Sequence, residues 1–440
     1  DMDVTEIPGA DNLFQAEGII RDVQERYATL YGVARSYLLV NGSSAGIIAA
    51  VLASVRPGKQ LIMARNCHKS VFNALSLGGL EPVFARPASD REYGVSGAIP
   101  TAEIERLLAE YPDADAVILP SPNYYGICSD IRAIADATHR AGKILIADQA
   151  HGAHLKFFKT FGFGEGMPPS AEDCGADIAI NSIHKTLASF TQSALLNLNS
   201  DRVDRRELED RLQAIESTSP SYILMASLDI NAEILETRGA EVMRAWKENI
   251  LYFREEAEKI SGLEVMHSSG IGCEIHRDGA AMDITKINLN MGALGIDGAR
   301  LEKLLIDEGI FPELYAGDLL MLMTGIGNTR AHMGRTLRAL ERIAANDARP
   351  SSERNAPLRM PEPGKFHAVP RKTTLVSASD AAGRICARSI IPYPPGIPLA
   401  CPGEEITPEI AQCARALRDA GEKVLGVDDL GRISVGAEES

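Results

Sequence analysis

Short apolar segments alternate with amphipathic segments through the first half of the chain. The apolar segments include QLIMA (60–64), AVILPSP (116–122) and KILIADQ (143–149). Between them lie segments with helical spacing of apolar residues, such as TAEIERLLAEY (101–111) and DIRAIADATHRAG (130–142). Strands that are apolar throughout are typical of a parallel sheet covered by helices on both faces. We therefore predict an α/β fold, with ligands bound at the carboxyl ends of the strands.

The chain has 440 residues, which is too long for one compact core and indicates two or three domains. Proline and charged residues at 348–372 predict a linker, and the proline-rich stretch IIPYPPGIPLACPGEEIT (390–407) predicts an extended rather than helical segment. A long helical region is expected at 201–260. The expected units are an extended segment at 1–16, a large domain at 17–245, a small α/β domain at 246–347, the linker at 348–372 and a C-terminal domain at 373–440.

Composition and charge exclude several classes of protein. The net charge of −15 argues against nucleic acid or an anionic membrane as a partner. No apolar run reaches the roughly 18 residues that a membrane-spanning helix needs. The seven cysteines include no C-x-x-C pair, and the amino terminus shows no signal-peptide pattern. We therefore expect reduced thiols in a cytoplasmic protein that binds no metal.

Lys185 lies in the stretch NSIHKTLASF (181–190), directly after the apolar run ADIAI (176–180). Lysine is rarely buried unless it is paired or used chemically. An amine that is removed from water has a lowered pKa and can attack carbonyl groups. The alternative is an exposed turn with a solvated ammonium group.

Two further strand ends carry residues that suit a ligand. Ser43 and Ser44, in NGSSAG (41–46), stand at the start of an apolar helix, where free backbone N–H groups suit a phosphate. Simple helix capping is the alternative. His68, in RNCHKS (65–70), opens a helix after QLIMA and could stack on a planar ring, or it could be a surface cap.

Asp148 is delivered by the apolar strand in ILIADQAHGAH (144–154). A carboxylate at the end of a buried strand must be paired or hydrogen-bonded. Asp148, His151 and His154 are close enough in sequence to suggest a metal site, but no further ligand cluster supports one.

Taken together, these strand ends describe a pyridoxal 5′-phosphate (PLP) site. A phosphate would lie at the helix start, a carboxylate would hold the protonated ring nitrogen, and a lysine would form a Schiff base. Ser43 and Ser44 would hold the phosphate, Asp148 the ring nitrogen and Lys185 the Schiff base. The ring of His68 would cover one face of the cofactor, and the small residue Ala150 would leave space on the other.

The motifs resemble those of the Orn/Lys/Arg decarboxylases. The resemblance covers nearly the whole chain and rests on LVNGSSAGI, ARNCHKS, SPNYYGICSDI, ADQAHGAH, SIHKT and the C-terminal YPPGIPL and PGE. It implies the fold type I of PLP-dependent transferases: a mostly parallel seven-stranded sheet with helices on both faces, plus smaller α/β C-terminal domains. It also implies a homodimer or a higher homo-oligomer, because sites of this fold type lie at a dimer interface.

The resemblance implies a role for each matching residue. Lys185 would carry PLP as a Schiff base, Asp148 would pair with the pyridine nitrogen, and His68 would stack on the ring. The phosphate would be surrounded by Ser43, Ser44, Ala45, Ser182 and His184, and the 3′-oxygen of the ring would lie near Asn123 and His151.

The sequence departs from the family in three places. Many relatives have Glu where this chain has Gln149, and Thr or Ser where it has Asn123. Both positions are expected near the ring. Short members often begin with a P-G-H-K segment that this sequence lacks, so either an upstream stretch was removed or that contribution to the site is lost.

The resemblance implies decarboxylation of arginine, lysine or ornithine to the corresponding amine and CO2, with His68 or Lys185 returning a proton to the substrate. Glu404, in CPGEEIT, is a candidate for binding the distal cation of the substrate, although a solvated turn carboxylate is the alternative. Two other functions remain: an aminotransferase or elimination or cyclisation enzyme that acts on an arginine-like amino acid, and a PLP-binding protein without activity.

Overall fold

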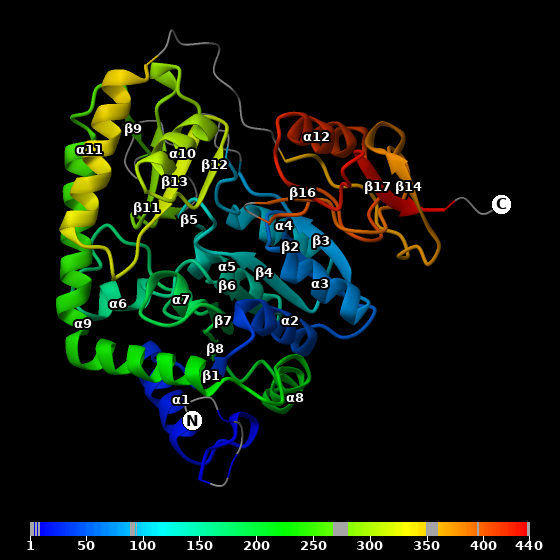
Figure 1. The fold of residues 1–440 in the computed structure, drawn as a ribbon. Helices are drawn as coiled ribbons and strands as arrows, with labels where there is room; N and C mark the ends of the chain where they lie inside the picture. The colour runs from blue at the N-terminus through cyan, green and yellow to red at the C-terminus, as the bar shows by residue number, and fades with distance from the viewer. Residues whose placement is uncertain are drawn as a thin grey trace.

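The computed structural model describes residues 4, 7, 9–88, 93, 95–266, 280–348, 360–393 and 396–437 (Figure 1). Part of the expected small domain (267–279), part of the expected linker (349–359) and two prolines of the C-terminal motif (394–395) lie outside the described residues.

The large domain is built on a seven-stranded sheet with the order β1-β8-β7-β6-β4-β2-β3. Neighbouring strands pair in parallel except at β8, which runs antiparallel to both β1 and β7. The prediction of a mostly parallel seven-stranded sheet is therefore confirmed. The strands are β1 (Arg35–Leu39), β2 (Gln60–Ala64), β3 (Glu81–Ala85), β4 (Ala116–Pro120), β6 (Ile144–Asp148), β7 (Ile178–Asn181) and β8 (Ala194–Leu198).

Helices cover the sheet, and the central strands are buried along nearly their whole length, which explains their continuous apolar sequences (Figure 1). The helices of the large domain are α1 (Ile19–Tyr31), α2 (Gly42–Ser54), α3 (Lys69–Gly78), α4 (Thr101–Glu110), α5 (Ile131–Arg140), α6 (Leu155–Thr160), α7 (Ile183–Thr186) and α8 (Arg205–Ile215), with a 3-10 turn, η1, at Leu13–Gln15.

The expected helical region at 201–260 consists of two helices, α8 and α9 (Tyr222–Ala257). The first helix ends at Ile215, and Ser221 caps the start of the second. Figure 1 shows α9 running below the large domain and then turning upward beside the small domain. The expected domain boundary at 245/246 thus falls inside one continuous helix.

The small domain contains a four-stranded sheet with the order β12-β13-β11-β9. Its core is separate from that of the large domain and is closed by helices α10 and α11. A short pair of strands, β5 and β10, joins the two domains. The elements are β5 (Ile127–Cys128), β9 (Glu264–Val265), β10 (Ala281–Met282), β11 (Lys286–Asn290), η3 (Gly292–Leu294), α10 (Gly298–Asp307), β12 (Leu314–Ala316), β13 (Leu319–Met323) and α11 (Arg330–Asn346).

The C-terminal domain has its own core. It is anchored to the large domain by Arg65, which follows β2 and donates hydrogen bonds of 2.7 Å to the carbonyl oxygens of Pro398 and Leu399. Its elements are β14 (Thr373–Ser377), η4 (Ala378–Asp380), β15 (Ile391–Pro392), α12 (Pro408–Asp419), β16 (Val424–Leu425) and β17 (Arg432–Gly436).

Candidate active site

A cavity of about 410 Å³ opens at the carboxyl ends of the central strands. It brings together predicted site residues that lie far apart in the sequence. Those that line it are Ser43, Ser44, His68, Asn123, Asp148, Ala150, His151, Ser182, His184 and Lys185. Ala45 is buried within α2 and is not among the lining residues.

Lys185 lies in α7, the single helical turn that follows β7, and its side chain is partly buried. Its Nζ is 2.9 Å from Nε2 of His151. Burial lowers the pKa of Lys185, and the negative charge of Asp148 opposes this shift. Lys185 is therefore a cavity lysine rather than a lysine on an exposed turn.

Asp148 is the last residue of β6 and is buried. Its Oδ1 accepts a hydrogen bond of 3.1 Å from the backbone N–H of Ala150. Burial raises the pKa of Asp148, whereas the charge of Lys185 lowers it. The carboxylate and the amine thus share one poorly solvated cavity, where each favours the charged form of the other.

His68 caps α3 and also lines the cavity. Its Nδ1 accepts a hydrogen bond of 3.3 Å from the backbone N–H of Ser70, so Nε2 carries the proton of the neutral ring. Burial, and then the charges of Lys185 and Lys69, lower the pKa of His68 to about 4. The ring is therefore neutral at physiological pH, which suits stacking on a flat group.

The start of α2 has no side-chain cap. Its N-cap is Asn41, whose side chain makes no capping hydrogen bond, so Ser43 and Ser44 lie in the first turn and do not cap the helix. Ser182 Oγ donates a hydrogen bond of 2.8 Å to Ser43 Oγ. His184 Nδ1 lies 2.9 Å from the carbonyl oxygen of Ser193, and burial lowers its pKa.

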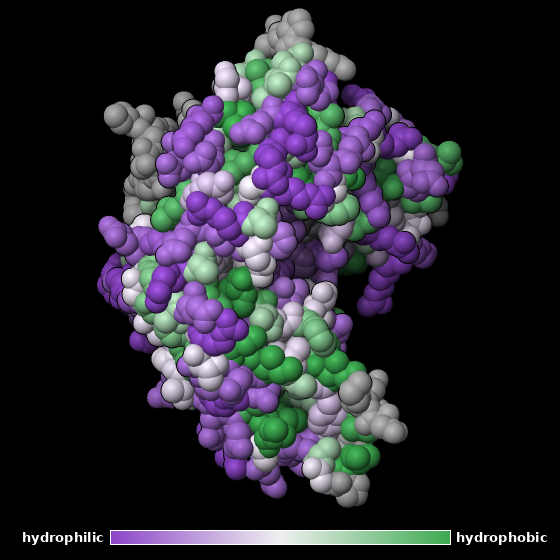
Figure 2. All heavy atoms as spheres, turned by 60° about the vertical axis from the view of Figure 1, so that its left-hand side comes forward, coloured by the Kyte–Doolittle hydropathy of each residue, from purple (hydrophilic) through white to green (hydrophobic). Residues whose placement is uncertain are grey.

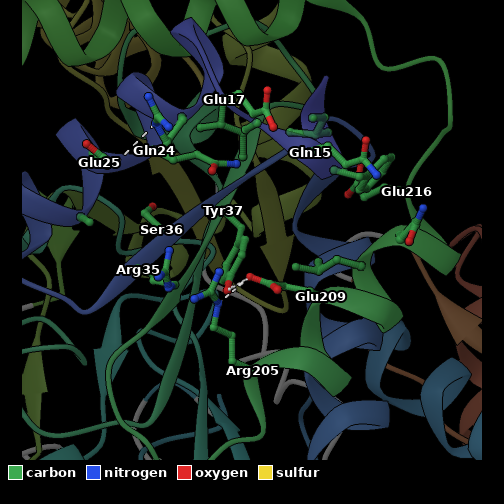
Figure 3. A pocket seen from close by; sticks show the side chains of 18 of the residues that line it. Gln15, Glu17, Gln24, Glu25, Arg35, Ser36, Tyr37, Arg205, Glu209 and Glu216 are labelled. Carbon is green, nitrogen blue, oxygen red and sulfur yellow. Dashed lines mark hydrogen bonds and ion pairs between the residues drawn. The ribbon is translucent and has the colours of Figure 1, made fainter. Parts of the chain in front are cut away.

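A second cavity, of about 500 Å³, lies beneath this helix start between α1, β1 and α8 (Figure 3). Glu216 is one of its lining residues and is 6% exposed. Its Oε2 accepts hydrogen bonds from the backbone N–H groups of Val40 (3.1 Å) and Asn41 (3.0 Å). Burial raises the pKa of Glu216 to about 7. Glu216 therefore supports the turn that presents Ser43 to the active-site cavity.

Asn123 lines the cavity, but its amide group is engaged by the backbone. Its Oδ1 accepts hydrogen bonds of 3.0 Å from the N–H groups of Tyr125 and Ile127, and its Nδ2 donates one of 2.7 Å to the carbonyl oxygen of Ser96. The amide thus shapes the loop after β4, and a contact with the 3′-oxygen of a cofactor would compete with these bonds.

Gln149 does not line the cavity, contrary to its expected position near the ring. It is buried in a polar cluster below the sheet, where Nε2 donates to Glu172 (2.9 Å) and to Asn181 (2.8 Å). Its Oε1 accepts a hydrogen bond of 2.6 Å from the N–H of Ala171. Side chains alternate across a strand end, so the neighbour of Asp148 points away from the site.

His151 and His154 have different surroundings. The ring of His151 lies 4.9 Å from that of Tyr124, and its Nδ1 is buried without a hydrogen-bond partner among the described residues. His154 is fully buried, and its ring nitrogens contact Thr186 and Asp283. Because its ring nitrogens already have these partners, His154 does not form a metal site with Asp148 and His151, the possibility that the sequence raised.

Glu404 does not reach the cavity, and the prediction that it binds the substrate cation is wrong. Its carboxylate is fully buried and lies 3.5 Å from Arg65. It accepts hydrogen bonds from the N–H groups of Gly364 (3.2 Å) and Cys401 (3.1 Å). The alternative of a solvated turn is equally wrong, because Glu404 fixes the C-terminal domain to β2.

Three lining residues with polar side chains were not predicted from the sequence. Tyr124 follows β4, Glu313 precedes β12 in the small domain, and Tyr393 comes from the C-terminal domain. The motif YPPGIPL contains Tyr393, but its sequence says nothing about the cavity. Glu313 stands in no motif, so no sequence signal could have identified it.

The large domain has the fold type I of PLP-dependent transferases, with a mostly parallel seven-stranded sheet. The structure superposes on lysine decarboxylase A from Pseudomonas aeruginosa with a TM-score of 0.82 at 20% identity, over 99% of this chain and 74% of that one. It superposes on the constitutive lysine decarboxylase of E. coli with a TM-score of 0.78 at 21% identity, over 97% of this chain and 73% of that one. These likenesses confirm the predicted fold.

The chain belongs to the Orn/Lys/Arg decarboxylase family. Residues 1–332 match the major domain of the Orn/Lys/Arg decarboxylases, and residues 351–428 match their C-terminal domain. The uncharacterized protein YaaO of Bacillus subtilis is 35% identical over 93% of this chain and 84% of its own length. An arginine decarboxylase of the same organism is 31% identical over 97% of this chain and 87% of its own length.

The family match and the named relatives show that the protein is a decarboxylase, as predicted. Across the described part of the chain, no helix is both long and apolar enough to cross a bilayer.

Proposed function

We propose that the protein decarboxylates a basic amino acid, with arginine as the preferred substrate, using PLP bound covalently to Lys185. The observation that carries the proposal is the pairing of Lys185, whose pKa is lowered by burial, with the buried carboxylate of Asp148 in one cavity. A lysine that lines a ligand cavity beside a carboxylate can react as a free amine and hold a cationic ligand nearby.

The residues of the cavity fit PLP. The uncapped start of α2 and the hydroxyl groups of Ser43 and Ser182 suit its phosphate. Asp148 would hold the ring nitrogen, and the neutral ring of His68 would cover one face. The volume of about 410 Å³ lies in the range of small-molecule sites. When bound, PLP supplies an electron sink for the electron pair that remains after the carboxylate leaves.

Lys185 is better placed than His68 to return a proton to the substrate carbon. His68, with a pKa of about 4, carries almost no transferable charge at neutral pH. Burial lowers the pKa of Lys185, which favours proton release from its ammonium group. His151 Nε2, at 2.9 Å, orients the amine.

Glu313 is the proposed receptor for the distal cation of the substrate. It lines the cavity from the small domain, and its carboxylate makes no ion pair or hydrogen bond within the described residues. A free carboxylate at the cavity mouth would bind a guanidinium or ammonium group and reject amino acids with neutral side chains.

The comparisons support arginine over lysine. Relatives named arginine decarboxylase are 29–31% identical to this chain, whereas those named lysine decarboxylase are 22–23% identical. The test is to incubate the PLP-loaded protein separately with arginine, lysine and ornithine and to identify the products by mass spectrometry. We expect the amine that is lighter than arginine by CO2. A keto acid would instead support the aminotransferase alternative.

Glu313→Gln tests the substrate-binding role, with Asp307→Asn as the matched control, since Asp307 is an exposed carboxylate on the same segment that does not line the cavity. We expect KM to rise at least about tenfold in Glu313→Gln and to stay unchanged in the control. An unchanged KM in both variants would exclude Glu313 as the receptor.

We also propose a homodimer formed through an apolar surface near the site. Phe190, Ile223 and Ile230 are 59%, 39% and 59% exposed. They lie together, because the N–H of Phe190 donates a hydrogen bond of 3.1 Å to Ser227 on the helix that carries both isoleucines. Figure 2 shows apolar side chains on the lower half of the molecule, where Figure 1 places α1 and the first half of α9. Light scattering should give twice the chain mass, and Ile230→Glu should give monomers.

A cytoplasmic location is part of the proposal. The six cysteines within the described residues are buried free thiols, which fits a reducing compartment.

A further inference from the structure

A closed ring of polar contacts, most of them buried, passes through Lys185. On one side, Lys185 Nζ lies 2.9 Å from His151 Nε2. The carbonyl oxygen of His151 accepts a hydrogen bond of 2.6 Å from Lys286 Nζ, which also lies 2.8 Å from Asp283 Oδ2. This side of the ring runs from the active-site cavity into the small domain.

The other side returns to the same lysine. Asp283 Oδ2 lies 3.1 Å from His154 Nε2, and His154 Nδ1 lies 3.2 Å from Thr186 Oγ1. Thr186 is the next residue after Lys185 in α7. Thr285 Oγ1 braces the middle of the ring, 3.2 Å from both His154 Nε2 and Lys286 Nζ.

The members of the ring that come from the small domain are fully buried. Asp283, Thr285 and Lys286 are each 0% exposed. An ammonium group has three N–H donors, and those of Lys286 are matched by Asp283, Thr285 and the carbonyl oxygen of His151. Lys286 therefore has no donor left for a substrate.

A buried ion pair rarely stabilises a fold more than apolar residues of the same size would. Stability alone is thus a weak reason for placing Asp283 and Lys286 here. The pair instead fixes the positions of two neighbours. Lys286 holds the backbone carbonyl group of His151, and Asp283 holds the ring of His154. Both histidines flank the turn that carries Lys185.

We propose that Asp283 and Lys286 are positioning residues that hold the Lys185 amine in its reactive orientation from the small domain. The inference rests on the proposed role of Lys185. It means that the reactive amine is in place only while the small domain is docked against the loop after β6.

The test uses a double variant, Asp283→Leu with Lys286→Met, which removes both charges and keeps similar side-chain volumes. The first readout is the pH dependence of Lys185 acylation by acetic anhydride in the cofactor-free protein, followed by peptide mass spectrometry. The charge of Lys286 lowers the pKa of Lys185 in the native protein. We therefore expect the midpoint of labelling to rise by about 0.5 pH unit or more in the double variant.

The second readout is the kinetics of the PLP-loaded enzyme. Loss of orientation at the amine should lower kcat by at least about tenfold and change KM by less than about threefold. The matched control is Asp177→Asn, which removes a buried carboxylate bonded to His139 and to the N–H of Leu145 at the opposite end of β7. Asp177→Asn should lower the melting temperature and leave both the labelling midpoint and kcat unchanged.

A folded double variant with a native labelling midpoint and native kcat would overturn the proposal. If the double variant does not fold, Thr285→Val decides through kcat, because it removes only the bracing hydroxyl group and leaves the charge of Lys286 in place. We then expect kcat to fall while the labelling midpoint stays near the native value; a native kcat in this variant would also overturn the proposal. Failure of the proposed function is seen separately, as a wild-type protein that releases no CO2 from any basic amino acid. The labelling comparison does not depend on that result.

Discussion

Gln149 and Glu172 form a buried amide–carboxylate pair, with Gln149 Nε2 2.9 Å from Glu172 Oε2. Glu172 has no basic partner among the described residues, and its other oxygen accepts hydrogen bonds of 2.8 Å from the side chains of Asn181 and Asn197. A carboxylate held by three amides is stable in this place because each amide donates an N–H group to it. Gln149, which differs from the glutamate of many relatives, therefore belongs to this buried polar cluster and not to the cavity.

This pair predicts the effect of restoring the glutamate found in relatives. Gln149→Glu would place two carboxyl groups within hydrogen-bond distance in a buried site. We expect a loss of about 3 kcal/mol in the free energy of unfolding, measured with urea at neutral pH. Adding Glu172→Gln exchanges the two groups and should recover most of the loss. If Gln149→Glu alone unfolds like the native protein, the pair does not have this role.

Ser43 and Ser182 are predicted to hold the phosphate of PLP. Replacing both with Ala should weaken PLP binding by about tenfold or more, since two hydroxyl groups beside a helix start are lost. The measurement is a fluorescence titration of the cofactor-free protein. Ser54→Ala is the control, because Ser54 is buried at the far end of α2. Equal affinities in both variants would contradict the assignment.

His68 is predicted to act as a flat neutral ring and not as an acid. Its pKa of about 4 leaves it uncharged above about pH 5. His68→Phe should therefore keep kcat within about tenfold of the native value, whereas His68→Ala should lose considerably more. Steady-state kinetics at pH 7 decides. If both variants are equally inactive, a ring nitrogen of His68 takes part in the reaction.

Glu216 predicts a pH dependence of stability. Its pKa is raised from 4.5 to about 7 in the folded protein, so the folded state binds a proton that the unfolded state releases between these values. The free energy of unfolding therefore falls as the pH rises from about 4.5 to about 7, rises again as the pH is lowered through that range, and is independent of this group well above 7. Between pH 8 and pH 6, the free energy of unfolding should rise by about 1 kcal/mol more in the native protein than in Glu216→Gln, measured by denaturation with urea. Parallel pH profiles would contradict the prediction.

The strand ends could be predicted from the sequence because each belongs to a continuous apolar segment. Asp148, His68 and Lys185 all follow such segments, and the structure brings them into one cavity. The antiparallel strand β8 had no signal of its own, because a fully buried strand looks the same in either direction.

What could not be predicted depends on side-chain direction and on distant parts of the chain. Gln149 was expected near the ring from the family resemblance, but consecutive side chains point to opposite faces of a strand. Glu404 was misplaced because its charge gave no indication of Arg65, its distant partner. Glu313 and Lys286 reach the site from the small domain, and nothing in their local sequence indicates it.

The attachment of the C-terminal domain has a consequence for the newly made chain. Lys185 and Asp148 are synthesised well before Tyr393, which closes one wall of the cavity, and before Pro398 and Leu399, to which Arg65 is anchored. A nascent chain on the ribosome can fold its central sheet early and still lack that wall. The wall that Tyr393 forms is therefore completed only after the C-terminal domain has been synthesised and has docked on the large domain.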